Sequence, residues 1–550
     1  MYGFTIIYNS TSKFSIENSK SISYKNHSFF YEQSSKFLND KIFTETPDFI
    51  IGIDGVILNL SQLKKQHNII DYTALIIHLF DLDKQFFKQF KGDFSGFIFN
   101  KNTEELICFT NHIGSQKLFY SQLDSSTIVS HRLETVTQFR KENRLNVVAA
   151  YELMTFGGMI ENKTLATDVY RLLGGEQLTV TPTSFKVSKY LDFNFVKATD
   201  TDSKKAIQKL DELFTSLITL EYEKDKEYGY EHFATLSGGL DSRMNVMAAN
   251  RMGYQTHNFC FSQSNYDDHK IAEQISNDLN NKFSFISLDN AEYLTQLDEN
   301  IEIYDGLIFY LASAHYNYTL NNLDREKSGL IHTGQIGDAI LGGFVSLSKP
   351  NYFSSMMSKK LEHKLAPIDT SKYASEETFK LYNRLFNVTT AGCYVSSHHQ
   401  SYIVAPFLDP EFIALCLSLH PNLKKEGKIY LEWINKLRPE VAKYKWEKTG
   451  FRPDAQWKNK LSQYSKKVKI TYYTVTNQQH KTSMNPYDYW YNNNKEVALF
   501  FENTFKNQID CISNSELKKD VCFLFETGNT IEKSMVLTLL STIKKLKIKA

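Results

Sequence analysis

The segment LSGGLDS (236–242) decides how this chain is interpreted. It follows the short apolar run HFATL (232–236), which predicts a strand, and it precedes a segment that predicts a helix. Two glycines at such a turn let backbone amides approach a ligand closely, and a helix N-terminus favours an anion. Ser237 and Ser242 add hydroxyl donors. Asp241 suits a phosphate site that also binds a divalent cation, because its oxygen atoms are hard ligands.

An ordinary glycine turn capped by serine and aspartate is the simpler alternative. From average composition, Ser-Gly-Gly-x-Asp-Ser arises by chance in only about one chain in a thousand of this length. The strand before the motif and the helix after it are the context that a phosphate loop needs. We therefore predict a phosphate-binding loop at 236–242.

The surrounding region alternates strands with helices. The predicted elements are helices over 205–223 and 268–280 and strands over 257–262, 283–288 and 329–334. Such alternation indicates βαβ units and a parallel sheet. Residues beyond 350 predict mainly helix.

The first 190 or so residues show a different pattern. Short β segments separated by turn residues predict a mixed sheet domain with few helices. The expected strands are FTIIY near the start and 48–55, 94–100, 106–110 and 126–130, with a hairpin over 175–190 and helices near 71–90 and 146–155. A polar stretch, KATDTDSKK (197–205), predicts a linker. We expect two domains, 1–195 and 205–550, of the α+β and α/β classes.

Composition excludes several classes of function. The 63 Lys and Arg residues nearly balance the 62 Asp and Glu residues, so no basic excess supports nucleic-acid binding. The longest apolar stretches, such as 74–80, are far shorter than a membrane-spanning helix, and the start of the chain has no signal-peptide pattern. None of the six cysteines forms a Cys-x-x-Cys pair, which predicts free thiols. We expect a cytoplasmic protein with neither nucleic-acid nor membrane partners.

The 236–242 loop resembles the pyrophosphate-binding loop of the N-type ATP pyrophosphatases, which adenylate a substrate and release pyrophosphate. NAD and GMP synthetases and tRNA-thiolating enzymes share this loop. Three further segments narrow the resemblance to asparagine synthetases: TGQIGDAILGGF (333–344), APFLD (405–409) and KTGF (448–451). They are similar, in order and spacing, to that family's Ser-Gly-Glu-Gly-x-Asp-Glu-x-x-Gly-Gly-Tyr, Pro-Phe-Leu-Asp and Lys-x-Gly-Phe. β-Lactam synthetases and lasso-peptide cyclases are related branches.

This resemblance covers most of 205–460 and implies a fold. An Ntn-hydrolase-like, glutamine-amidotransferase-like sheet domain would come first. An adenine-nucleotide α-hydrolase-like domain, which is Rossmann-like with a parallel sheet, would follow and end in a helical part. The similar segments near the start, such as DGVILN (54–59), support the first domain.

The resemblance also implies roles for individual residues. The pyrophosphate portion of ATP would be held by Ser237, Gly238, Gly239, Asp241 and Ser242. Mg²⁺ would be held by Asp241 and Asp338, and the adenosine would be bordered by Leu236, Phe261 and Gly334. Lys448 would place a cation on the departing phosphates or on the tetrahedral intermediate.

Two N-terminal positions depart from the family pattern. Tyr2 stands where the family has its N-terminal nucleophilic cysteine, and tyrosine has no thiol. Asp54 replaces the side-chain amide that would stabilise an oxyanion, and its negative charge would oppose one. We predict that glutaminase activity is lost and that glutamine is not the nitrogen donor.

Gln335 is a third departure, within the synthetase domain. The family has a glutamate there, which is thought to take the proton from the attacking amine, and a carboxamide cannot act as a general base. β-Lactam synthetases place a tyrosine at this position and attack intramolecularly. Gln335 stands at the position of the family's catalytic glutamate and is kept as a candidate catalytic residue. Glu302 or Tyr304 could supply the base.

The sequence thus predicts a ligase that adenylates a carboxylate with ATP and Mg²⁺ and joins it to an amine, releasing AMP and pyrophosphate. The simplest substrates are aspartate and ammonia. A peptide, a β-amino acid or a glycan acid are alternative substrates, and a degenerate nucleotide-binding scaffold is the non-enzymatic alternative. A homodimer is a further expectation for the assembly of this protein.

Overall fold

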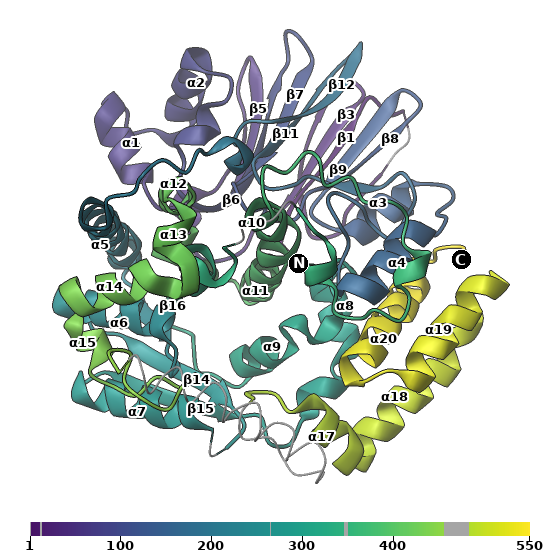
Figure 1. The fold of residues 1–550 in the computed structure, drawn as a ribbon. Helices are drawn as coiled ribbons and strands as arrows, with labels where there is room; N and C mark the ends of the chain where they lie inside the picture. Colours follow the sequence, from purple (N-terminus) through teal and green to yellow (C-terminus); the bar gives the residue numbers. More distant parts are fainter. Residues whose placement is uncertain (1, 12–13, 265, 346–349, 456–482) are drawn as a thin grey trace.

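The computed structural model describes residues 2–11, 14–264, 266–345, 350–455 and 483–550 (Figure 1). Three β-sheets organise them. Two antiparallel sheets come from the first 190 residues, and one parallel sheet comes from the middle of the chain. The last helices, yellow in Figure 1, lie together at one side of the molecule. All six cysteines are free thiols, as predicted.

The two antiparallel sheets face each other, and each has six strands. The first sheet has the order β10 (Tyr170–Arg171), β8 (Phe119–Leu123), β9 (Ser126–Ser130), β1 (Gly3–Tyr8), β3 (His27–Glu32) and β2 (Lys20–Tyr24). The second has the order β12 (Ser184–Lys189), β11 (Glu176–Thr181), β7 (Glu105–Thr110), β6 (Gly92–Asn100), β5 (Phe49–Ile57) and β4 (Ile42–Glu45). Ile50 and Phe97 enter the core between the sheets, whereas their neighbours Ile51 and Ile98 enter the outer core. This alternation follows from the two-residue period of a strand.

Helices cover the outer faces of this sandwich. α1 (Leu60–His67) and α2 (Tyr72–Leu82) share an apolar cluster with the second sheet. α3 (Leu133–Phe139) packs on β8 and β9 of the first sheet, and α4 (Val147–Phe156) belongs to the same cluster. α2 is shorter than the predicted 71–90, because Asp83 is extended and Phe86–Gln89 forms a separate 3₁₀ turn. The expected sheet domain with few helices is confirmed.

Five parallel strands form the third sheet, in the order β15 (Lys282–Ser287), β14 (His257–Ser262), β13 (Glu231–Thr235), β16 (Ser328–His332) and β17 (Tyr402–Val404). The chain starts at β13 and moves outward through α6 (Leu240–Arg251), β14, α7 (Asp267–Asp278) and β15. It then returns to β16 on the other side of β13. This reversal creates a topological switch point at the carboxyl ends of β13 and β16, where ligands bind in such sheets.

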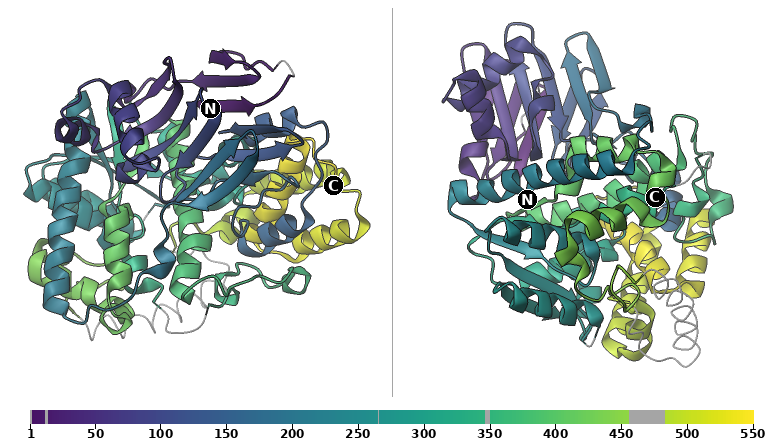
Figure 2. Two further views of the ribbon diagram at one scale, coloured as in Figure 1. Left: turned by 90° about the horizontal axis from the view of Figure 1, so that it is seen from above. Right: turned by 60° about the vertical axis from the view of Figure 1, so that its left-hand side comes forward.

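The remaining helices surround this sheet and form the C-terminal part (Figure 2). They are α5 (Ser203–Tyr228), α8 (Leu297–Tyr304), α9 (Ala314–Asn321), α10 (Glu376–Lys380), α11 (Phe386–His398), α12 (Pro410–Ser418), α13 (Pro421–Lys424), α14 (Lys428–Leu437), α15 (Pro439–Ala442), α17 (Tyr487–Asn493), α18 (Lys495–Gln508), α19 (Ser515–Thr527) and α20 (Thr530–Lys545). α20 packs against both α4 and α8, so the end of the chain contacts its N-terminal part.

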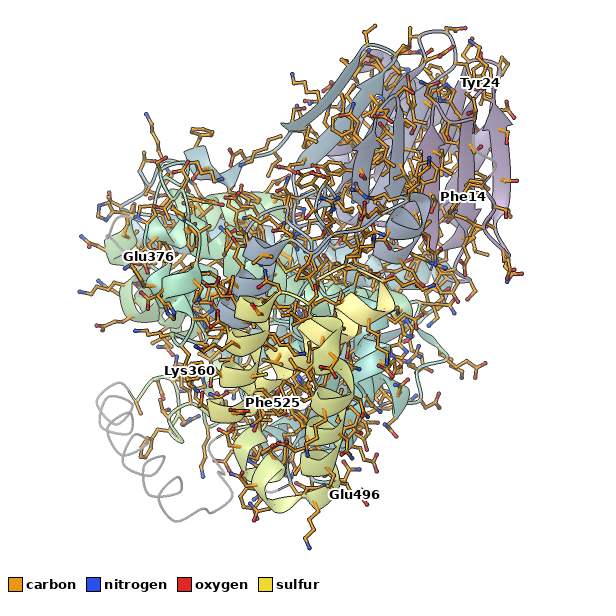
Figure 3. All side chains as sticks on the ribbon, turned by 90° about the vertical axis from the view of Figure 1, so that its right-hand side faces the viewer. Phe14, Tyr24, Lys360, Glu376, Glu496 and Phe525 are labelled. Carbon is orange, nitrogen blue, oxygen red and sulfur yellow. The ribbon has the colours of Figure 1, made fainter. Side chains whose placement is uncertain are left out.

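Two labelled side chains mark opposite ends of the molecule. Tyr24 lies in the outer part of the sheet sandwich, and Glu496, on the first turn of α18, lies at the opposite end (Figure 3). Among the described residues, none of the helices combines the length and the apolar character needed to cross a bilayer. The predicted succession of a sheet domain, a parallel sheet and a helical end is confirmed, and the structure shows that the first part consists of two antiparallel sheets.

Candidate active site at the carboxyl edge of the parallel sheet

The turn between β13 and α6 is built around two glycines. Gly239 precedes the first residue of α6 and caps it. The N–H of Gly238 donates to Oδ1 of Asp268 at 2.8 Å. A Cβ atom on Gly238 would lie 2.7 Å from Cβ of Glu447 and 2.9 Å from Oδ1 of Asp268. Only glycine therefore fits at this position of the turn.

Two serine hydroxyls lie at the N-terminus of α6. Oγ of Ser242 accepts the N–H of Ser237 at 3.0 Å, and the two hydroxyl oxygens are 3.1 Å apart. The N–H of Gly239 donates to Oγ of Ser237 at 3.1 Å. Hydroxyls and amides are thus gathered where the helix dipole favours negative charge. The turn has the donors that an anion needs.

The loop after β16 meets this turn at Asp241. The N–H of Asp338 donates to Oδ2 of Asp241 at 2.9 Å, and the hydroxyl of Tyr430 donates to Oδ1 at 2.7 Å. A Cβ atom on Gly334 would lie 2.2 Å from the backbone of Asp241, so this close approach requires glycine. The fold thus brings together Asp241 and Asp338, which are 97 positions apart in the sequence.

The charge at Asp241 is not fully compensated by its neighbours. Burial raises the pKa of Asp241, and the nearby carboxylate of Asp338 raises it further. Two aspartates on adjacent loops, with like charges, form the hard oxygen donor set that Mg²⁺ prefers. The residues present therefore fit a magnesium ion.

A cavity of about 1560 Å³ opens at this switch point. It is lined by nearly all of the site residues predicted from the sequence: Leu236, Ser237, Gly239, Asp241, Ser242, Phe261, Gly334, Gln335, Asp338 and Lys448. Gly238 is not among the lining residues, because its N–H and its carbonyl face Asp268 and Arg243. The structure thus gathers segments from four parts of the chain around one space.

Lys448 reaches this cavity from the segment that follows α15. Its side chain is exposed, and Nζ lies 5.4 Å from the ring centroid of Trp446. Trp446 and Glu447 line the same cavity. The ammonium group can therefore face an anion that is bound beside Asp241.

Arg243 connects the glycine turn to the segment that leads to Lys448, and the sequence reading missed it. Its guanidinium is fully buried and donates to the carbonyl of Gly238 at 2.7 Å. It also donates to the carbonyls of Val441 at 3.0 Å and Lys445 at 2.8 Å. Burial lowers the pKa of Arg243 to about 10, so it stays charged at neutral pH. The sequence signal that could have pointed to Arg243 is its position directly after LSGGLDS.

Gln335 lies in the cavity wall with an unusual backbone beside it. Its Oε1 is buried and has no hydrogen-bond partner among the described residues. The next residue, Ile336, has a φ of 63°, a left-handed value that β-branched residues rarely adopt. Such strain persists where the surrounding structure holds it, often at functional sites.

The structure does not bring the predicted substitute bases to this cavity. Neither Glu302 nor Tyr304 is among its lining residues. Glu302 faces Lys545 at 4.0 Å, and Tyr304 is fully buried. His315 does line the cavity, and no sequence motif marked it. Burial lowers its pKa to about 4, so the imidazole is neutral at pH 7.

In the N-terminal domain, side chains nearly fill the place where the resemblance puts a glutaminase site. The cavity beside Tyr2 measures about 20 Å³, which holds about one water molecule. The ring of His131 occupies the space, and its Nδ1 accepts the N–H of Phe4 at 2.9 Å. Asp54 is buried and accepts the hydroxyl of Tyr31 at 2.8 Å.

Comparison with known families agrees with this arrangement. Residues 209–400 match the family model of asparagine synthase, and residues 41–138 match that of a glutamine amidotransferase domain. The chain has the domain architecture of the asparagine synthetase family. No curated protein gives a significant match.

Several solved structures are similar to parts of this asparagine synthetase-like chain. Glutamine phosphoribosylpyrophosphate amidotransferase from B. subtilis, complexed with ADP and GMP, is 14% identical over 46% of this chain and 59% of its own, with a TM-score of 0.23. NMN synthetase from Francisella tularensis is 19% identical over 26% of this chain and 60% of its own, with a TM-score of 0.19. NAD⁺ synthetase from Burkholderia pseudomallei is 14% identical over 46% of this chain and 94% of its own, with a TM-score of 0.18. The chain thus spans about three fifths of the amidotransferase, at 59%.

The residues that depart from the sequence pattern of asparagine synthetases lie at two places in the structure. Tyr2 lines the closed N-terminal cavity, Asp54 accepts a hydrogen bond from Tyr31 in the wall of that cavity, and Gln335 lies in the wall of the large one. Asp241, Asp338 and Lys448 keep the residue types of the family motifs. The residues that the resemblance assigns to adenylation are therefore of the family's types, whereas those that it assigns to glutamine hydrolysis are not.

Proposed function

We propose that this protein is an ATP-dependent ligase that adenylates a carboxylate and then forms an amide with an amine, releasing AMP and pyrophosphate. The observation that carries this proposal is the meeting of Asp241 and Asp338 at the switch point, beside the serine hydroxyls of the turn. Lys448 lines the same cavity and adds a positive charge. The match of residues 209–400 to asparagine synthase supports the same reaction class.

Each element of the site has a chemical task in this proposal. Ser237, Ser242 and the N-terminus of α6 bind the pyrophosphate portion of ATP, while Leu236, Phe261 and Gly334 border the adenosine. Asp241 and Asp338 would hold Mg²⁺, which would supply the positive charge that neutralises phosphate groups. Lys448 stabilises the negative charge that develops on the leaving group.

The nitrogen donor in this proposal is ammonia or another amine, and not glutamine. A cavity of about 20 Å³ beside Tyr2 is far too small for a glutamine side chain. Tyr2 also provides no thiol for the covalent step of glutamine hydrolysis. The N-terminal domain then serves as a structural partner of the ligase domain.

Aspartate is the simplest carboxylate, but one observation favours a larger substrate as a second candidate. The site cavity of about 1560 Å³ exceeds the roughly 300–1,000 Å³ typical of small-ligand pockets. It has room for a peptide, a β-amino acid or a glycan acid beside the nucleotide. The carboxamide of Gln335 would orient the attacking amine without deprotonating it.

The test measures pyrophosphate and AMP release by purified protein with ATP and Mg²⁺. The first arms are aspartate with ammonia, aspartate with glutamine, and no substrate, followed by a panel of peptides, β-amino acids and uronic acids. We expect release that depends on an acid and on ammonia or an amine, but not on glutamine. Asp241→Asn abolishes this release, whereas Asp298→Asn, an exposed change on α8, leaves it intact. Binding of ATP without any acid-dependent release across the panel would favour a nucleotide-binding scaffold instead.

A further inference from the structure

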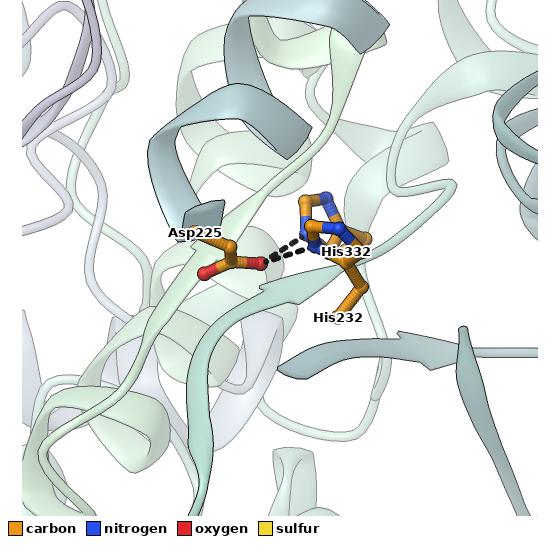
Figure 4. Close-up of side chains that lie close together, drawn as sticks. All are labelled: Asp225, His232 and His332. Atoms are coloured by element: carbon orange, nitrogen blue, oxygen red, sulfur yellow. Dashed lines mark hydrogen bonds and ion pairs between the residues drawn. The ribbon is translucent and has the colours of Figure 1, made fainter. Parts of the chain in front are cut away.

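A second group of metal-ligand side chains lies on the face of the parallel sheet covered by α5. Asp225 comes from the end of α5, His232 from β13 and His332 from the end of β16 (Figure 4). His332 pairs with Ala234 in the parallel register, so His232 and His332 point to the same face of two adjacent strands. One ligand atom from each of the three residues lies within 4.8 Å of the other two.

The distances in this cluster suit a small tetrahedral ion. Nε2 of His332 lies 2.8 Å from Oδ2 of Asp225, and Nδ1 of His232 lies 3.1 Å from the same oxygen. Bonds of about 2.0–2.1 Å to zinc place neighbouring ligand atoms about 3.3 Å apart in a tetrahedron. Shifts of a few tenths of an ångström would therefore convert the two hydrogen bonds into coordination.

The outer partners of the cluster support the same interpretation. Nδ1 of His332 faces Oε2 of Glu221 at 3.6 Å, and neither atom has a hydrogen-bond partner among the described residues. A carboxylate behind a ligating histidine is the usual second-layer arrangement of zinc sites. Oδ1 of Asp225 accepts the N–H of Leu330 at 2.9 Å, and the ring of Tyr222 stacks on His332 at 3.8 Å. Asp225 and His332 are thus oriented by their neighbours.

Charge balance points the same way. Asp225 is buried and faces two imidazoles that are neutral when they bind a metal. A divalent cation would compensate the charge of this carboxylate, and buried charges are stable only when they are compensated. The side chain of His232 is 10% exposed, which gives an ion a route from solvent.

We propose that Asp225, His232 and His332 form a structural site for a divalent transition metal of the zinc class. The site joins α5, β13 and β16 directly below Thr333 and Gly334, which begin the loop that carries Asp338. It therefore fixes the strand ends that form the cavity, and it takes no part in the chemistry. Imidazole nitrogen ligands favour zinc over magnesium, which prefers oxygen ligands, and a water molecule would complete the tetrahedron.

The test measures bound metal in the full-length protein. After chelation and dialysis against a zinc-buffered solution, elemental analysis is expected to give about one equivalent of zinc per chain, since the ligands form a single site. Co²⁺ in place of zinc should give the visible absorption of a tetrahedral site. Chelation should lower the melting temperature of the wild-type protein.

Variants decide whether the metal is held by these residues. His232→Gln and His332→Gln should lose the zinc and the cobalt spectrum, while Asp241→Asn should retain both. The matched control is His257→Gln, a histidine on the neighbouring strand that contacts Ser284 at 2.8 Å. Because His332 is fully buried and its variant could fail to fold, the partly exposed His232 is the deciding position. Folded wild-type protein that binds neither metal, or equal binding by His232→Gln, would overturn the proposal and leave a hydrogen-bonded cluster.

Discussion

The guanidinium of Arg243 donates a hydrogen bond of 2.8 Å to the carbonyl of Lys445, three residues before Lys448. The same guanidinium donates to the carbonyl of Gly238 in the glycine turn at 2.7 Å. One buried side chain therefore sets the distance between the turn and the segment that carries the lysine. Its planar fork suits this task, because it can bond several carbonyls at once.

Arg243→Lys should slow adenylation more than it weakens ATP binding. Lysine keeps the charge but cannot reach all the carbonyls, so the Lys448 segment moves relative to the turn. Misplacement of about 1 Å at a reacting centre can reduce rates about a hundredfold, and we expect a fall in kcat of at least tenfold. The measurement is pyrophosphate release at varied ATP, with thermal unfolding to verify the fold. Arg251→Lys, an exposed change on the same helix, is the control. Equal kinetics in both variants would show that Arg243 has no positioning role.

Tyr430→Phe should move the acidic limb of the pH profile to higher pH. The Tyr430 hydroxyl bonds Oδ1 of Asp241 at 2.7 Å and lowers the pKa of that carboxyl, opposing burial and Asp338. A hydrogen bond to a charged group is worth about 1.5–3 kcal/mol, so its loss should raise the pKa by about one to two units. In the proposed function the ionised carboxylate binds the cation, so activity should then require a higher pH. Tyr151→Phe, which removes a 2.8 Å bond to Asp520, should leave the profile unchanged. An unshifted limb in Tyr430→Phe would argue against Asp241 as the titrating group.

The sequence predicted the parts of this molecule that local patterns encode. The strands and helices around LSGGLDS follow from apolar periodicity, and the turn follows from two glycines in a row. β17 escaped prediction because three residues show no period, and β2 (KSISY) because it is polar and largely exposed. Strands of this kind form because neighbours pair with them, which is tertiary information.

The same division applies to the site. Asp241, Asp338 and Lys448 lie in motifs, so they could be named from the sequence. Tyr430 and His315 lie in no motif and reach the cavity only through the packing of α14 and α9. The suggested bases Glu302 and Tyr304 lie on α8, outside the lining of the cavity, because no sequence pattern fixes where a side chain lies relative to Gln335.

Tyr2→Cys should not restore hydrolysis of glutamine, although it supplies the missing thiol. The ring of His131 fills the space, because a Cβ atom on Gly3 would lie 2.4 Å from its Cγ. Asp54 would still oppose an oxyanion. The measurement is glutamate release from glutamine, with ammonia-dependent pyrophosphate release showing that the variant is folded. Glutamate production by Tyr2→Cys would mean that the closed cavity opens in solution.

Asp93→Asn should stabilise the protein at high pH and have little effect at low pH. Asp93 lies on β6 and is 2% exposed. Its Oδ1 accepts a hydrogen bond of 2.5 Å from Nε2 of Gln116. Burial raises its pKa to about 7 in the folded protein, against about 3.9 in an unfolded chain. The folded state therefore holds the proton more tightly, and stability falls as pH rises from about 4 to about 7. Asparagine cannot ionise, so above about pH 7 the free energy of unfolding of the variant should exceed that of the wild type by up to about 4 kcal/mol.

The gain from Asp93→Asn has a distinctive pH dependence, which separates it from a general packing effect. The melting temperature of the variant should exceed that of the wild type at pH 8, and the two should converge near pH 4. Asp81→Asn, on the exposed end of α2, should match the wild type at both values. A constant difference between Asp93→Asn and the wild type across this range would mean that the carboxyl is ionised in the folded protein, with Gln116 and its other neighbours compensating the charge.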